Sequence, residues 1–237
     1  MKIIATRQDC MRNLRSVVKV LVLAVLMLAL GNPAAFAAAV SFTAADVTGN
    51  YSSDHNRVVG WEFTTNSAII VTELGFYDAN ADGLVESHDV GLYTIGGTLL
   101  VSGTVLSGTA GTLDGMFRYV DVADTPLAAN GTFVIGALIL GTSSSHQGDL
   151  WTWYDEVVGV NVINPTIDPT ISMYGPGGTR FNCCSDTTLT FPATRGDMRT
   201  AFLGPNFQLT PVPVPATAWL FGSGVVGLLG FRRRIIS

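Results

Sequence analysis

The central part of this chain alternates short runs of β-branched and aromatic residues with Gly, Asn and Asp, and no helical period is sustained there. Such runs are typical of β-strands, because branched and aromatic side chains pack well on a pleated surface whereas Gly, Asn and Asp favour turns. The pairs Gly96-Gly97 and Asn130-Gly131 are typical of hairpin turns. The predicted strands are residues 58–64, 68–77, 90–95, 99–106, 116–122, 132–140, 150–158 and 207–210. We therefore predict an all-β fold over residues 38–210, an antiparallel two-sheet β-sandwich of the jelly-roll or immunoglobulin-like type.

The first 37 residues follow the three-part order of a secretory signal peptide. A basic stretch is followed by an apolar run over residues 20–30 and by the breaker pair Asn32-Pro33. Signal peptidase requires small side chains at the first and third positions before its cut, and Ala37 and Ala35 supply them. We expect export by the general secretion route and cleavage after Ala37. The alternative is an uncleaved anchor helix, for which the apolar run is short.

The end of the chain, residues 211–237, combines a proline-rich motif, an apolar helix and a basic end. Proline rings fix the backbone, so the segment before Ala216 is stiff and extended. As a helix, the uncharged residues 216–231 rise about 24 Å, slightly less than the roughly 30 Å hydrocarbon core of a bilayer. The cluster Arg232-Arg233-Arg234 follows at once. Because positive charge stays cytoplasmic, we expect this transmembrane helix to place the central domain across the membrane.

This tail resembles the PEP-CTERM sorting signal of exopolysaccharide-producing Gram-negative bacteria. Val214 stands where the family's motif has Glu, and Val-Pro-x-Pro variants occur in that family. The resemblance implies processing by an exosortase-type transpeptidase, a tethered intermediate facing the periplasm, and final placement at the outer surface or in the extracellular matrix. The alternative is a plain tail anchor. The matching residues are Val212-Pro213-Val214-Pro215-Ala216-Thr217-Ala218-Trp219-Leu220-Phe221-Gly222-Ser223-Gly224, Gly227-Leu228-Leu229-Gly230 and the three arginines.

Segments of the central region resemble a β-sandwich domain of unknown function that occurs ahead of such tails. The resemblance covers about half of the domain, chiefly its first hundred residues, and implies an extracellular, non-catalytic module. The matching segments are Thr72-Glu73-Leu74-Gly75-Phe76-Tyr77-Asp78, Asp82-Gly83-Leu84, Ser87-His88-Asp89-Val90-Gly91-Leu92-Tyr93, Gly97-Thr98-Leu99-Leu100, Phe117-Arg118-Tyr119-Val120, Gly131-Thr132-Phe133-Val134-Ile135-Gly136-Ala137 and Gly204-Pro205-Asn206-Phe207.

Charge is distributed unevenly along the chain. Residues 38–215 contain five arginines, no lysine and 17 acidic residues, a net charge of −12. A domain this acidic repels phosphate backbones, which argues against nucleic acid as a partner. Metal cations and basic surfaces are the favoured partners, and the alternative is that the acids only keep an exported domain soluble.

One Asp-rich loop has the spacing of a calcium site. Residues 78–89 fit D-x-N-x-D-G with an acid at the twelfth position, and Gly83 is placed to take the sharp turn. Calcium prefers six to eight oxygen ligands, which alternate residues of such a loop can supply. The opposing hypothesis is a hairpin loop whose side chains satisfy their own backbone, and the strand-like flanks and single copy favour it over an EF-hand. His88 is interpreted as a structural hydrogen-bonding residue. The predicted ligands are Asp78, Asn80, Asp82, the Leu84 carbonyl, Glu86 and Asp89.

Two tryptophans suggest a second type of site. Trp151 and Trp153 lie on one face of a predicted strand, beside Asp155 and Glu156. Aromatic faces next to carboxylates can hold pyranose rings, whereas alternating tryptophans are also typical of the inner face of a sandwich. A carbohydrate platform and a core role both remain open.

Catalytic patterns are missing from the sequence. Ser145, His146 and Asp149 lie near one another, but the domain has no G-x-S-x-G elbow and no H-E-x-x-H motif. The vicinal pair Cys183-Cys184 admits a strained ring, a bridge to another chain or free thiols.

The sequence therefore predicts a non-enzymatic envelope or matrix protein associated with exopolysaccharide or biofilm. The alternatives are a calcium-dependent carbohydrate-binding module and, after it, a secreted hydrolase. The expected partners are signal peptidase, an exosortase-type enzyme, the membrane before processing, and an extracellular polysaccharide.

Overall fold

The computed structural model of the protein describes residues 36–51, 55–141, 149–155, 161–184, 186–196 and 199–212. Within these ranges the chain is all-β with antiparallel pairing, apart from the short 3-10 turn η1 (Ala44–Asp46). The apolar run at residues 20–30, Ala35 and the tail from Pro213 onward lie outside the described residues. In the described ranges no helix is long and apolar enough to span a bilayer.

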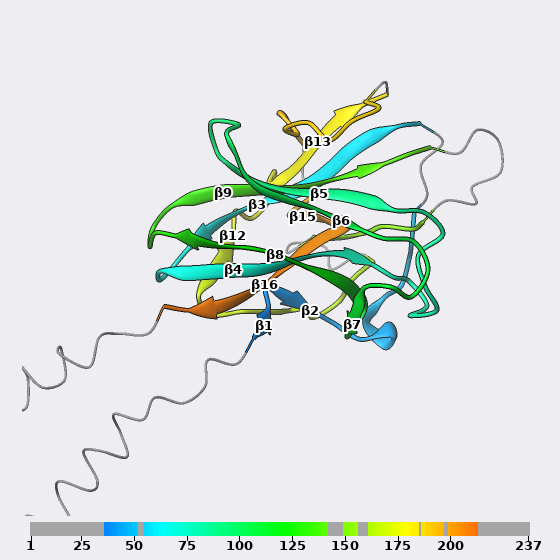
Figure 1. Ribbon diagram of the computed structural model, residues 1–237, viewed down its shortest axis with the longest axis horizontal. Coiled ribbons are helices and arrows are strands. Elements are labelled where there is room, and N and C mark those ends of the chain that lie inside the picture. The colour runs from blue at the N-terminus through cyan, green and yellow to red at the C-terminus, as the bar shows by residue number, and fades with distance from the viewer. Residues whose placement is uncertain are drawn as a thin grey trace, which may run out of the picture. The chain divides into compact units, whose positions relative to one another are not determined.

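Two large sheets form the body of the domain (Figure 1). The smaller sheet contains, in spatial order, β1 (Ala37–Ala38), β16 (Pro205–Pro211), β4 (Ile69–Tyr77), β8 (Phe117–Leu127) and β7 (Thr112–Asp114). The larger sheet contains β14 (Thr194–Arg195), β13 (Thr179–Cys183), β3 (Arg57–Thr65), β9 (Thr132–Ile139), β5 (His88–Thr94) and β6 (Leu99–Val105), with β12 (Ile171–Met173) also paired to β3. Two separate two-stranded ribbons complete the domain: β10 (Thr152–Tyr154) pairs with β15 (Ala201–Leu203), and β11 (Thr166–Ile167) pairs with β2 (Val40–Ser41).

Aromatic side chains from both large sheets meet in a single core. Trp61 and Phe63 of β3 pack against Phe207 of β16, with ring centroids 5.8 and 4.9 Å apart. The indole N–H of Trp61 donates to the carbonyl of Pro205 over 2.9 Å, so this large side chain is buried without losing its hydrogen bond. Burial of each such side chain contributes about 1.5–3 kcal/mol. The predicted face-to-face antiparallel packing is thus present, and the finer assignment to a jelly-roll or immunoglobulin-like type stays a prediction.

The outer face of the larger sheet is covered as well. Gly60, Gly136 and Gly91 lie opposite one another on β3, β9 and β5 and form a row without side chains. A Cβ at Gly136 would lie 2.9 Å from Pro192, and one at Gly91 would lie 2.9 Å from Leu189. The glycine row therefore makes room for the segment around these two residues, and β3 is buried on both faces.

The two ends of the described chain lie side by side at the edge of the smaller sheet. Ala37 of β1 pairs with Leu209 of β16, and the N–H of Ala39 donates to the Phe207 carbonyl over 2.9 Å. β16 ends at Pro211, the first residue of the proline-rich tail. The two termini therefore leave the domain at neighbouring positions (Figure 1).

Each predicted strand overlaps an observed one, but the turns and the polar strands differ from expectation. Gly96-Gly97 joins the hairpin of β5 and β6 as predicted. The prediction of a hairpin at Asn130-Gly131 is wrong, because β8 pairs with β4 whereas β9 pairs with β3 and β5, so this turn carries the chain from one sheet to the other. Asn130 adopts a φ of 61°, which suits that turn.

Candidate functional site

The first residue of the Asp-rich loop is held by a buried arginine. Asp78 Oδ2 accepts from Arg118 Nε over 2.7 Å and from the Gly83 N–H over 3.0 Å. The Asp78 and Arg118 side chains are only 2% and 5% exposed. The guanidinium also donates to the carbonyls of Ala81, within the loop, and Gly111, just before β7, at 3.3 Å. It therefore connects the loop to the segment that precedes β7.

Two further predicted ligands have other partners. The Leu84 carbonyl accepts from the Gly108 N–H over 2.6 Å. Asp89 lies on strand β5, where its Oδ1 accepts from Thr104 Oγ1 over 2.6 Å. Gly83 does take the turn, with a φ of 117°. Across the described residues no three His, Cys, Asp or Glu side chains are grouped so as to hold a metal. Asp78, Leu84 and Asp89 are thus engaged within the protein, as in the alternative of a self-satisfied turn, with Arg118 added, and calcium binding by this loop stays a prediction.

Of the other predicted ligands, Asn80 and Asp82 are exposed, and Glu86 lies beside a buried His–Asp pair. His88 is fully buried against Phe76, with ring centroids 3.6 Å apart. Its Nδ1 lies 3.0 Å from the Leu138 carbonyl and its Nε2 lies 2.9 Å from Asp149 Oδ2. His88 is thus a structural hydrogen-bonding residue, as predicted.

Asp149 ties the loop to this pair. Its carboxylate accepts the backbone N–H groups of Val85 and Glu86 at 2.8 and 2.9 Å. Burial opposes ionisation, but the hydrogen bonds from His88 and these amides outweigh it and lower the pKa of Asp149. Burial, together with the nearby Asp149 charge and against the opposing effect of His88, raises the pKa of Glu86. The His88–Asp149 pair therefore anchors the loop through the backbone of Val85 and Glu86.

Both tryptophans of the predicted sugar platform are buried. Trp151 is 6% exposed and Trp153 is 8% exposed, and both belong to the hydrophobic core. Neither ring presents an open flat face, so the core alternative is the one that the structure shows. Asp155 is buried too, and Glu156 lies outside the described residues. An exposed aromatic platform on this strand is therefore a wrong prediction, because β10 and β15 turn this face inward.

Trp153 supports an arginine. Tyr51 stacks on the indole with a centroid separation of 3.6 Å, and the guanidinium carbon of Arg199 lies 3.9 Å from the indole centroid. Because both groups lie directly over the same ring, they must occupy its opposite faces. Stacking on an aromatic face holds a guanidinium in a fixed plane. Arg199 is thus presented by the core tryptophan.

Arg199 belongs to a pocket that combines cations with aromatic side chains, here termed the arginine–aromatic pocket. Its volume is about 400 Å³, within the range of small-ligand sites. It lies where the larger sheet meets the β10–β15 ribbon. The indole N–H of Trp151 is buried and has no acceptor among the described residues. The lining residues are Arg57, Val59, Trp151, Phe181, Arg195, Gly196, Arg199 and Phe202.

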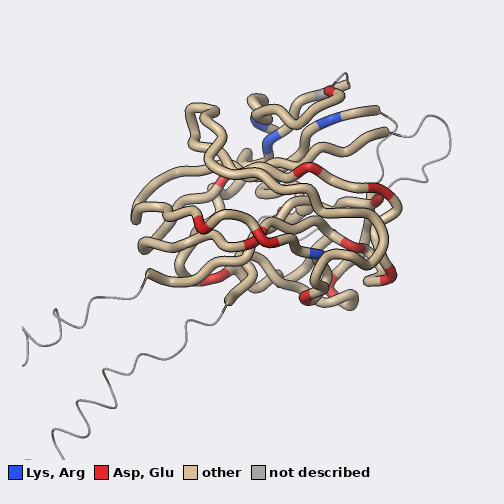
Figure 2. Tube along the Cα trace, viewed as in Figure 1, with Lys and Arg blue, Asp and Glu red and all other residues tan. Residues whose placement is uncertain are grey.

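Strand pairing brings these residues together. β13 lies between β3 and β14, with Cys183 opposite Arg57 and Arg180 opposite Arg195. Phe181 of β13 meets Phe202 of β15 edge to face at 6.3 Å. Figure 2 shows most of the basic positions at this end of the larger sheet, with a further one in the smaller sheet, and acidic positions spread over the molecule, this end included.

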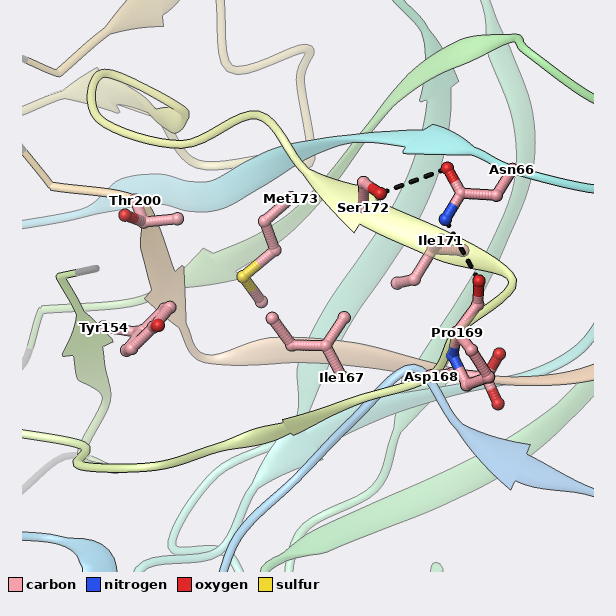
Figure 3. Close-up of a pocket in the computed structure, with 9 residues that line it drawn as sticks. All are labelled: Asn66, Tyr154, Ile167, Asp168, Pro169, Ile171, Ser172, Met173 and Thr200. Carbon is pink, nitrogen blue, oxygen red and sulfur yellow. Dashed lines mark hydrogen bonds between the residues drawn. The ribbon is translucent and has the colours of Figure 1, made fainter.

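A second pocket of about 290 Å³ lies on the Tyr154 side of the β10–β15 ribbon (Figure 3). Its polar groups bond to each other: Asn66 Oδ1 accepts from Ser172 Oγ at 3.1 Å, and Asn66 Nδ2 donates to the Pro169 carbonyl at 3.0 Å. It contains no arginine or lysine, so it offers a ligand less than the arginine–aromatic pocket does. The lining residues are Asn66, Tyr154, Ile167, Asp168, Pro169, Ile171, Ser172, Met173 and Thr200.

The other sequence candidates contribute little. Ser145 and His146 lie outside the described residues. Cys184 takes part in a disulfide bond, so the free-thiol alternative does not hold for it. Of the residues that line the arginine–aromatic pocket, Trp151 was a sequence candidate and the others were not, although the presence of five arginines and no lysine in the domain was a usable signal.

Comparison with known proteins assigns no family. No family model matches the chain, and no curated protein sequence matches it. Among solved structures, the cysteine protease and lectin-like domains of Cwp84, a surface layer associated protein of Clostridium difficile, align over 69% of this chain and 34% of theirs, with 12% identity and a TM-score of 0.40. A second structure of that clostridial protease, after propeptide cleavage, aligns over 70% of this chain and 38% of its own, with 13% identity and a TM-score of 0.39. A structure of infectious bursal disease virus, Gx strain, aligns over 79% of this chain and 44% of its own, with 14% identity and a TM-score of 0.22.

The chain thus spans about a third of the length of the Cwp84 chains that it matches. Similarities of this size support no inference about ligand or activity.

Proposed function

We propose that the protein is an exported, non-enzymatic β-sandwich module of the bacterial envelope or extracellular matrix that binds a polysaccharide. The observation that carries this proposal is the arginine–aromatic pocket. Sugars present apolar C–H faces and polar hydroxyl rims, and they are held where aromatic side chains adjoin hydrogen-bond donors. The half-buried Phe181 supplies the accessible aromatic surface above the buried Trp151 and Phe202, and Arg195 and Arg199 supply donors.

A binding role is supported by how the buried acids are used. Asp78 pairs with Arg118, Asp149 pairs with His88, and Glu62 accepts from two arginines. A carboxylate fixed in such a pair holds structure together and is poorly placed to take up or release a proton during catalysis.

Export and sorting form part of the same proposal. Signal peptidase would cut after Ala37, and an exosortase-type transpeptidase would act at the Pro213-Val214-Pro215 motif. The pairing of Ala37 with Leu209 supports a domain whose two processing points lie close together. After the first cut, the Ala39 N–H keeps its bond to the Phe207 carbonyl, so the new N-terminus stays attached to β16. Mass spectrometry of the mature protein tests both cuts, and a mature chain that retains residues 1–37 or the tail contradicts them.

Binding is tested by isothermal titration of the full chain with extracellular polysaccharide from an exopolysaccharide-producing Gram-negative bacterium, in the presence of EGTA. We expect binding without calcium and about tenfold weaker binding for Phe181→Ala, since removing an aromatic face costs roughly 1.4 kcal/mol. The matched control is Leu113→Ala, an exposed apolar side chain on β7. The absence of heat with wild-type protein refutes the proposed function, and equal affinities of wild type and Phe181→Ala refute this pocket as the site.

A further inference from the structure

The arginine–aromatic pocket concentrates positive charge in a domain that otherwise carries little of it. Three of the five arginines in residues 38–215 line this one pocket. Among the described residues that line it none is acidic, and the described acid bonded to one of its arginines is the buried Glu62. A concave site lined by one sign of charge focuses the local potential. An anionic ligand is therefore drawn to this pocket and repelled from most of the remaining surface.

Arg199 offers its donors to a ligand. Its guanidinium lies over the Trp153 ring at 3.9 Å, with the Phe202 ring at 6.0 Å. Within the described part of the chain, no carboxylate pairs with it. Stacking engages the flat face of a guanidinium and leaves its in-plane N–H groups to form hydrogen bonds. The side chain is thus positioned by aromatic rings and carries a positive charge into the pocket.

Arg195 is positioned by a buried acid. Its Nη2 donates to Glu62 Oε1 and Oε2 at 2.7 and 2.9 Å, while its Nη1 donates to the Tyr174 hydroxyl at 3.2 Å. Glu62 also accepts from Arg180, so two guanidinium groups share one carboxylate and the cluster keeps an excess of positive charge. The hydrogen bond to Glu62 raises the pKa of Arg195. The Arg195 side chain remains 43% exposed and accessible to a ligand.

We propose that this pocket selects a carboxylated sugar residue, a uronate within an acidic polysaccharide. The carboxylate lies between Arg195 and Arg199, and the pyranose face packs on the half-buried Phe181. The planar fork of arginine matches a carboxylate bidentately, and such charge-assisted bonds are the strong ones. This inference rests on the proposed function, to which it adds the class of ligand.

The test compares two forms of one polymer. The full chain is titrated with polygalacturonate oligomers and with the same oligomers after complete methyl esterification, which removes the charge and keeps the sugar backbone. Loss of a charge-assisted bond corresponds to a factor of about ten or more in affinity, so we expect the acidic form to bind at least about tenfold more tightly. Binding of the acidic form weakens as salt is added.

Variants locate the binding. Arg199→Gln is expected to lower affinity for the acidic oligomers about tenfold and to lower affinity for the esterified form by a smaller factor, because the esterified form loses only a hydrogen bond that is not charge-assisted on both sides. Arg199→Lys keeps the charge without the planar fork, so its affinity for the acidic oligomers should lie between that of wild type and that of Arg199→Gln. The matched control is Asp124→Asn, an exposed position on β8 outside the pocket, which removes a negative charge. Unchanged affinity in this control supports the pocket, whereas stronger binding indicates a general charge effect and overturns the inference.

The remaining outcomes separate this inference from the function beneath it. Equal affinity for acidic and esterified oligomers, or no binding of polygalacturonate, overturns carboxylate selection. The proposed function survives either result if the bacterial polysaccharide still binds, and both fall if it does not. Preference for dextran sulfate over polygalacturonate points to sulfate recognition and likewise overturns the inference.

Discussion

The substitution Asp78→Asn separates the two interpretations of the Asp-rich loop. Asn keeps the shape of the side chain and removes its charge, which leaves the Arg118 guanidinium buried without its counter-ion. Removing one partner of a buried ion pair costs about 3–5 kcal/mol. For a domain of this size, each kcal/mol corresponds to roughly 2–4 °C in Tm, so we expect a decrease of about 6–20 °C.

Thermal unfolding of the full chain, followed by circular dichroism near neutral pH, measures this effect with calcium and with EGTA. The matched control is Asp82→Asn, because Asp82 is exposed and no described residue bonds its carboxylate. A purely structural loop predicts a change within about 0.5 kcal/mol for the control and the same Tm for wild type in both buffers.

The calcium hypothesis predicts a different pattern. A bound metal stabilises the folded state by mass action, so EGTA would lower the wild-type Tm. Asp82→Asn would then abolish that difference, and Asp78→Asn would do the same. If wild type loses several degrees in EGTA and the two variants behave alike, the structural role assigned to Asp78 and Arg118 is refuted.

Three other substitutions test the buried structure by chemical denaturation. Because the pKa of Asp149 is lowered on folding, its contribution to stability is complete above its unfolded value of 3.8 and is lost as pH falls through the lower folded value. Asp149→Asn should therefore flatten the dependence of stability on pH below 3.8, and an unchanged profile would contradict this. Trp153→Ala removes a core ring and should cost about 3–5 kcal/mol, whereas a loss below about 1 kcal/mol would place the ring outside the core. Gly60→Ala would overlap the Ile135 carbonyl oxygen and should cost about 3 kcal/mol or more; wild-type stability would disprove the close approach of β3 and β9.

The main strands were predictable because each carries its own signal. β4 and β9 are long runs of branched and aromatic residues, and burial on the pleated surface follows directly from that pattern. β13 was missed because Arg180 and Asn182 make it look like a polar loop. Its polarity is satisfied only in the folded state, where Arg180 donates to Glu62, 118 residues away in sequence. Local pattern carries no information about such a partner.

The Asp-rich loop shows the same limit from the other direction. Its spacing indicates calcium when the loop is considered alone, and nothing within it reveals that the Asp78 carboxylate will pair with Arg118. The arginine belongs to β8 and reaches the loop only because β8 pairs with β4, the strand that ends next to Asp78. A motif of acidic residues thus specifies a metal site only when no cation of the same chain is brought to it by the fold.

The pocket and the termini lie on different sheets, which bears on how a tethered module can bind. β1 and β16, where the described chain begins and ends, form one edge of the smaller sheet. The pocket is lined by residues of β13, β14, β15 and the start of β3, and β13 and β14 lie at the opposite end of the strand order in the larger sheet from β6. The sheet in which the described chain begins and ends is therefore not the one that carries Arg57 and Arg195. On the proposed function, we expect that removing residues 213–237 leaves the affinity of the pocket for polysaccharide unchanged.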